Sequence, residues 1–124
     1  MTIAAILVLV GRAILGLFFV IAGIRNFAHF SQRLETAKTN YGWKMPAPLL
    51  AIGFLMQLLG GFSVLFGVWT VWGALDLIVF LVVATSLFHN CLMFSGKERD
   101  PHLYLSLVNT ALAGFCLMVI GLAL

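Results

Sequence analysis

The sequence predicts an all-α integral membrane protein, with four transmembrane helices in an antiparallel bundle. Hydrophobic residues make up 63% of the chain and charged residues only 9%, whereas soluble domains have roughly 25% charged residues. Four apolar runs lie at about residues 3–24, 47–69, 71–89 and 103–124. Each is close to the ~20 residues that a helix needs to cross the hydrocarbon core. So few polar side chains could not cover a water-facing surface, so a soluble domain is excluded.

The first run, residues 3–24, carries a single charge, Arg12, near its middle. An arginine inside a span costs at least ~3 kcal/mol unless it faces protein, water or a counter-charge. No basic segment precedes the run, and the run is too long for the apolar core of a secretory signal. We therefore expect a retained helix. The face with Arg12, which also carries Asn26, should pack against the other spans.

The connection after the first run has a periodicity of its own. Its apolar residues recur at steps of three and four: Phe27, Phe30, Leu34, Ala37 and Tyr41. This pattern favours an amphipathic interfacial helix between the first two spans. An ordinary loop resting on the bundle is the alternative. Gly42 is expected to end the helix, and Trp43 to anchor the chain at the membrane interface.

The remaining runs and the basic residues predict the topology. The second and third runs are joined by a short turn, so they should form an antiparallel hairpin. Six of the seven Lys and Arg residues lie in two connections: Arg25, Arg33, Lys38, Lys44, Lys97 and Arg99. Because such connections face the cytoplasm, both termini are expected outside. The net charge of +3 therefore indicates orientation in the membrane and not binding to nucleic acid.

Asp76 is the expected counter-charge for Arg12. It lies about five residues inside the outer end of the third run, or roughly 8 Å at the helical rise. Arginine is long enough to extend along its helix to that depth. Small residues and isolated amides, among them Gln57 and Asn109, lie on the inward faces of the other spans. We therefore predict a buried structural ion pair, Arg12–Asp76, with one of these amides nearby.

Several short segments carry a family resemblance. In order they are residues 12–23 (RAILGLFFVIAG), Arg25, residues 45–48 (MPAP), residues 57–61 (QLLGG), residues 88–90 (FHN) and Asn109. With these segments the whole chain, residues 1–124, resembles a single membrane domain of the DoxX family of small four-helix bacterial membrane proteins. That family often has glutamate where Gln57 stands. The amide removes an ionisable group, which argues against a proton-linked role at this position.

The resemblance implies a membrane subunit or partner of redox systems in the bacterial cytoplasmic (inner) membrane. A related family supplies a membrane subunit of thiosulfate:quinone oxidoreductase, and similar proteins are linked to thiol and oxidative-stress handling. The expected contacts are the lipid bilayer and either other membrane-associated redox proteins or a second copy in a homo-oligomer. Nucleic acid is not expected.

A quinone is the one cofactor for which the sequence offers a candidate site. Such a site needs an apolar slot with a few hydrogen-bond donors. The candidate donors are Arg12, Gln57, His89 and Asn109, and the candidate walls are Phe18, Phe19, Phe54, Phe62 and Phe80. The alternative for Gln57 and Asn109 is that their amides only satisfy each other.

Neither a metal nor a catalytic residue is expected. His29, His89 and His102 all fall at the cytoplasmic ends, so no two of them face each other within the bundle as a bis-histidine haem requires. The alternative is that the clustered histidines form a zinc or copper site with Cys91, Glu98 or Asp100, but no ligand pair has a recognised metal-site spacing. A nucleophile, a redox centre or a tuned acid–base pair is not evident either. The leading hypothesis is a non-catalytic accessory subunit that docks redox proteins and contributes to a quinone pocket. The alternative is a stand-alone quinone- or thiol-linked oxidoreductase, or a small-molecule transporter.

Overall fold

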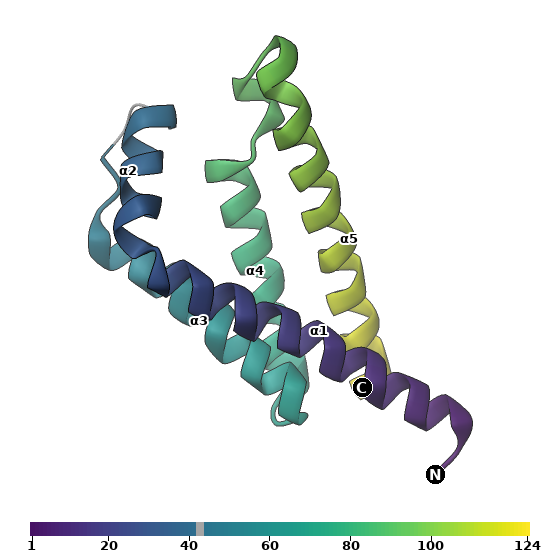
Figure 1. Ribbon diagram of the computed structural model, residues 1–124. Coiled ribbons are helices and arrows are strands. Elements are labelled where there is room, and N and C mark those ends of the chain that lie inside the picture. The colour runs from purple at the N-terminus through teal and green to yellow at the C-terminus, as the bar shows by residue number, and fades with distance from the viewer. Residues whose placement is uncertain (42–43) are drawn as a thin grey trace.

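The computed structural model describes residues 1–41 and 44–124 (Figure 1). Its α-helices are α1 (Ile3–Ala28), α2 (Phe30–Tyr41), α3 (Ala47–Phe66), α4 (Thr70–Phe88) and α5 (Arg99–Ala123), with two short 3-10 helices, η1 (Cys91–Met93) and η2 (Gly96–Glu98), between the last two. No strand occurs in these residues. Four helices, α1, α3, α4 and α5, are long and apolar enough to cross a membrane. The predicted all-α, four-span fold is confirmed. The expectations for Gly42 and Trp43 lie outside the described residues.

The four long helices form two pairs. The helices α1 and α3 pack along each other, α4 and α5 do the same, and the contact of α3 with α4 joins the pairs. In Figure 1 the pairs converge where both termini and the α3–α4 turn lie, which we call the narrow end. They diverge toward α2 and the α4–α5 connection, which we call the wide end. The molecule is therefore a wedge of two helix pairs.

Glycines bring the backbones of α1 and α3 into direct contact. A Cβ added to Gly16 would lie 2.6 Å from Leu65 Cα and 2.8 Å from the carbonyl oxygen of Gly61. A Cβ on Gly61 would lie 2.9 Å from the backbone nitrogen of Val20. Small residues allow this approach between membrane helices, where packing replaces the hydrophobic effect as the attractive force. The main core cluster then fills the space among the pairs with Leu15, Phe19, Val64, Ala74, Leu77, Leu81 and Cys116.

The amphipathic segment between the first two spans is helical, as predicted, and forms α2. Its apolar face rests on the protein. Ala37 is fully buried in a second cluster with Met45, Leu50 and Phe54, and Phe30, Leu34, Leu87 and Phe88 pack against that cluster. Apart from Met45, which precedes α3, these residues come from α2, α3 and α4. The helix α2 therefore closes the wide end from one side.

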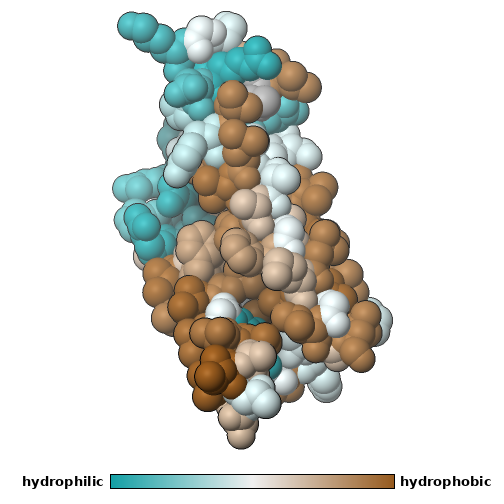
Figure 2. Space-filling model, turned by 90° about the vertical axis from the view of Figure 1, so that its right-hand side faces the viewer, coloured by the Kyte–Doolittle hydropathy of each residue, from teal (hydrophilic) through white to brown (hydrophobic). Residues whose placement is uncertain are grey.

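The surface agrees with a chain that contacts lipid. Large apolar side chains point outward along the spans; Leu7, Leu59 and Leu117 are each at least 60% exposed. Figure 2 shows hydrophobic residues over the lower part of one face and hydrophilic residues gathered toward its upper end. That upper end is the wide end of the wedge, where the basic connections lie. The bilayer is thus the environment of the four spans.

Candidate functional site

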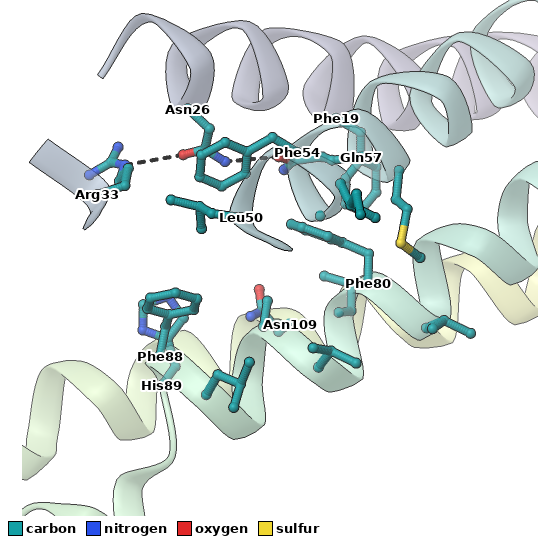
Figure 3. Close-up of a pocket in the computed structure, with 18 of the residues that line it drawn as sticks. Phe19, Asn26, Arg33, Leu50, Phe54, Gln57, Phe80, Phe88, His89 and Asn109 are labelled. Carbon is teal, nitrogen blue, oxygen red and sulfur yellow. Dashed lines mark hydrogen bonds between the residues drawn. The ribbon is translucent and has the colours of Figure 1, made fainter. Parts of the chain in front are cut away.

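A cleft of about 650 Å³ lies between the two helix pairs, toward the wide end (Figure 3). Small-molecule sites in proteins have volumes of roughly 300–1,000 Å³. Its lining is mostly apolar, and its aromatic members are Phe18, Phe19, Phe54, Phe80 and Phe88. The cleft therefore has the size and the walls for a flat apolar ligand.

One wall carries a chain of hydrogen bonds through three helices. Arg33 Nε of α2 donates to Asn26 Oδ1 of α1 at 3.2 Å. Asn26 Nδ2 then donates to Gln57 Oε1 of α3 at 2.8 Å. Gln57 is 5% exposed, so its amide is held deep in the protein by this chain. In Figure 3 the three side chains follow one another along the upper wall.

The opposite wall carries an amide and an imidazole. Asn109 Nδ2 of α5 donates to Thr85 Oγ1 of α4 at 3.0 Å. His89 caps the C-terminus of α4 and lies 5.7 Å, ring to ring, from His102 of α5. The hydroxyl of Ser106 donates to the backbone carbonyl oxygen of His89, which ties the cap to α5. Both walls therefore place polar groups against an otherwise apolar slot.

His89 has a neutral imidazole at pH 7. Burial lowers its pKa from 6.5, and the charge of nearby His102 lowers it further. His89 Nδ1 is buried and has no hydrogen-bond partner among residues 1–41 and 44–124. Because a neutral imidazole can donate through one nitrogen and accept through the other, His89 can bond to a ligand in either sense.

The cleft contains most of the residues that the sequence suggested for a quinone. Gln57, His89 and Asn109 line it, whereas Arg12 does not. Of the suggested aromatic walls, Phe62 alone is not in the lining. Gln57 and Asn109 do not satisfy each other, because they are bonded to Asn26 and Thr85.

The structure does not bring the predicted Arg12–Asp76 pair together. The position of a Cβ on Gly67 lies 2.7 Å from Arg12 Nη2, and that of a Cβ on Gly60 lies 2.6 Å from Asp76 Oδ2. Gly60 and Gly67 are two turns of α3 apart, or ~10 Å at the helical rise. In the described part of the chain Arg12 Nε and Asp76 Oδ2 are buried without a hydrogen-bond partner. Arg12 lies instead at the C-terminal end of α3, where the helix dipole is negative. The predicted amide neighbours of the pair lie in the cleft.

Sequence reasoning missed the role of two cleft residues. Asn26 was expected only on a packing face, and Arg33 only as an orientation signal. Their spacing of seven residues is two helical turns, which would have placed both on one face if the helix were continuous. The sequence signal for this link was therefore the spacing of seven residues. It was not decisive, because the helix is interrupted: α1 ends at Ala28 and α2 begins at Phe30.

The three histidines do not gather as a metal site. His29 lies on α1's C-terminal cap, where its Nδ1 is 2.9 Å from the carbonyl oxygen of Arg25. Only His89 and His102 lie beside each other. In the chain outside residues 42–43, no three His, Cys, Asp or Glu side chains lie together.

Residues 7–90 match the family model described as DoxX. The match covers well over half of the chain, from the first turns of α1 through α4, and includes Asn26, Arg33, Gln57 and His89. No curated protein and no solved structure matches the chain.

Proposed function

The chain belongs to the DoxX family of membrane proteins, and from this premise we propose that it is an accessory membrane subunit of a redox system and that its own cleft binds a lipid-soluble quinone. The proposal takes residues 1–124 as one membrane domain. It puts the chain in the bacterial inner membrane with both termini outside, since six of the seven Lys and Arg residues lie in two connections.

One observation carries the quinone proposal: polar groups face each other across an apolar slot. Gln57 comes from one helix pair, and Asn109 and His89 come from the other. A quinone carries two carbonyl oxygens at opposite edges of a flat ring. Groups on two opposing walls can therefore bond both carbonyls while aromatic side chains contact the ring. The apolar remainder of the cleft is suited to the tail.

The chemistry of the side chains around the slot supports the accessory role. The polar groups that line it are amides, imidazoles, a guanidinium and a hydroxyl, and none of these groups is redox-active. They can bind and orient a quinone, and a partner protein would exchange electrons with it. The broad apolar surface of the spans offers that partner a place to dock.

Quinone binding is tested with tritiated decylubiquinone and the purified protein in detergent micelles. We expect saturable binding that Gln57→Leu weakens about tenfold, the effect of one hydrogen bond lost from a buried site. Gln32→Leu is the matched control, because Gln32 is exposed on α2 and does not line the cleft. Binding that does not saturate, or that Gln57→Leu leaves unchanged, would refute the quinone site.

The alternative is a stand-alone quinone- or thiol-linked oxidoreductase, or a small-molecule transporter. It is favoured by the fact that helices of one chain supply polar groups to both walls of the cleft. Purification from native membranes separates the two. Redox subunits that co-purify support the accessory role, whereas a lone protein with quinone-dependent turnover supports the alternative.

A further inference from the structure

The hydrogen-bond chain on the cleft wall has a direction, and Arg33 sets it. A guanidinium only donates hydrogen bonds. Asn26 must therefore accept from Arg33 Nε through Oδ1, which leaves its Nδ2 to face Gln57. Nδ2 only donates, so Gln57 must accept through Oε1. The orientation of both side-chain amides thus follows from the fact that arginine only donates. It does not depend on the atomic positions of the amide nitrogen and oxygen, which are hard to distinguish from each other.

The end of this chain presents a donor to the cleft. With Oε1 turned to Asn26, Gln57 has its Nε2 hydrogens left for a ligand, and no hydrogen bond within the described residues uses them. Asn109 is different, because its partner is the hydroxyl of Thr85. A hydroxyl both donates and accepts, so the Asn109 amide can present either of its groups. Gln57 therefore presents a fixed donor on one wall, whereas Asn109 can present either a donor or an acceptor on the other.

We infer that the cleft selects for a hydrogen-bond acceptor at Gln57 and so binds the oxidised quinone more tightly than the quinol. This inference rests on the proposed function and names the form of the ligand. A quinone carbonyl accepts from Gln57 Nε2 and carries no hydrogen that would need an acceptor. A quinol hydroxyl at that point can also accept, but its hydrogen would lie among Phe19, Phe54 and Phe80, whose rings offer no strong acceptor (Figure 3). A buried donor without a partner weakens binding.

Arg33 and Asn26 act through Gln57 and are positioning residues. This makes a near-isosteric variant decisive. In Asn26→Asp the carboxylate still accepts from Arg33, but it cannot donate to Gln57. It accepts instead from Gln57 Nε2, which turns Gln57 Oε1 toward the cleft. The donor at the end of the chain becomes an acceptor, and the preference between quinone and quinol should reverse.

The experiment measures the affinity of the purified protein for tritiated decylubiquinone and, in separate anaerobic samples, for the same compound reduced to the quinol. We expect the wild type to favour the quinone by roughly tenfold. Asn26→Asp should favour the quinol, and Arg33→Met, which frees Asn26 to turn, should bring the ratio of the two affinities close to unity. Arg25→Met is the matched control, since Arg25 is exposed on α1 and outside the cleft lining. It should keep the wild-type ratio.

The outcomes separate the two proposals. Equal affinities in the wild type, or a wild-type ratio in both Asn26→Asp and Arg33→Met, would overturn the acceptor selectivity and leave the quinone site standing. If neither form binds, the quinone site fails and the selectivity fails with it. Gel-filtration elution and thermal unfolding identify a variant that has lost its fold, and the other variant then decides the test.

Discussion

The glycine contact between α1 and α3 gives the sharpest stability prediction. At Gly16 an added methyl group would lie 2.6 Å from Leu65 Cα and would also meet the backbone nitrogen of Leu65, whereas ordinary contact begins at 3.4 Å. The obstacle is backbone, so no rotamer change relieves it. The two helices must separate locally by roughly 1 Å, because the backbone nitrogen of Leu65 is the nearest atom. A Cβ on Gly11, five residues earlier on α1, would meet nothing within 4 Å.

The expected magnitude follows from comparing Gly16→Ala with Gly11→Ala. Both changes gain the same helix propensity, ~1 kcal/mol, so that gain cancels in the comparison. Overpacking costs about 1–3 kcal/mol, and a gap of 0.5–1 Å removes about a quarter to a half of the dispersion attraction across the opened contact. Since the clash is with backbone, we expect the upper part of this range. Gly16→Ala should be less stable than Gly11→Ala by about 3 kcal/mol.

The assay is equilibrium unfolding in mixed micelles, with increasing sodium dodecyl sulfate and helix content followed by circular dichroism. The difference in unfolding free energy between the two alanine variants is the measured quantity. A difference below ~0.5 kcal/mol, the usual size of a neutral surface effect, would show that α1 and α3 do not meet at Gly16.

Two further predictions concern the turn after α3 and the cap of α4. Gly67→Ala should lose more stability than Gly96→Ala: both sites have positive φ, 71° and 61°, but only a Cβ on Gly67 meets a guanidinium. Gly96→Ala should cost about 1–2 kcal/mol in thermal unfolding; adding Arg12→Met should recover part of the larger loss at Gly67, and no recovery would contradict the contact. His89 lies outside the membrane-spanning segments. Because its pKa is lowered in the folded protein, the unfolded chain binds more protons near this pKa. The contribution of His89 to the folding free energy is therefore fully present above pH 6.5 and is lost as pH falls below it. The melting temperature should therefore fall between about pH 8 and about pH 5.5, and less so in His89→Asn; equal falls would refute this assignment.

The spans could be predicted because length and hydropathy alone decide them. An apolar run near 20 residues has one low-energy solution in a bilayer, a helix whose backbone bonds are all internal. The ends shifted by a few residues for local reasons. For example, α3 stops where Gly67 takes the left-handed conformation, a detail that a hydropathy profile does not contain.

The relative rotation of the helices could not be predicted in the same way. Depth in the membrane suggested that Arg12 and Asp76 could meet, and depth follows from residue number. Whether they do meet depends on which helix lies next to each. Arg12 and Asp76 both lie against α3, at Gly67 and at Gly60, and so reach different levels of that helix. Sequence spacing within one helix does not fix such relations between helices.

The cleft was predictable in its chemistry and less so in its connections. Isolated polar residues in apolar spans are few, and they face the interior because lipid cannot satisfy them. That reasoning found Gln57 and Asn109. It did not find that Arg33 reaches Gln57 through Asn26, because this link crosses from α2 to α1 and on to α3.

The wedge shape also has a mechanical consequence. The helix pairs meet at the narrow end, while the cleft lies toward the wide end. A helix of twenty residues such as α3 is a lever about 30 Å long. Turning one pair by about 5° at the narrow end would move the far end of that helix by roughly 2.6 Å. A protein that binds the narrow end and turns one pair would thereby widen or close the cleft without contacting the ligand inside it.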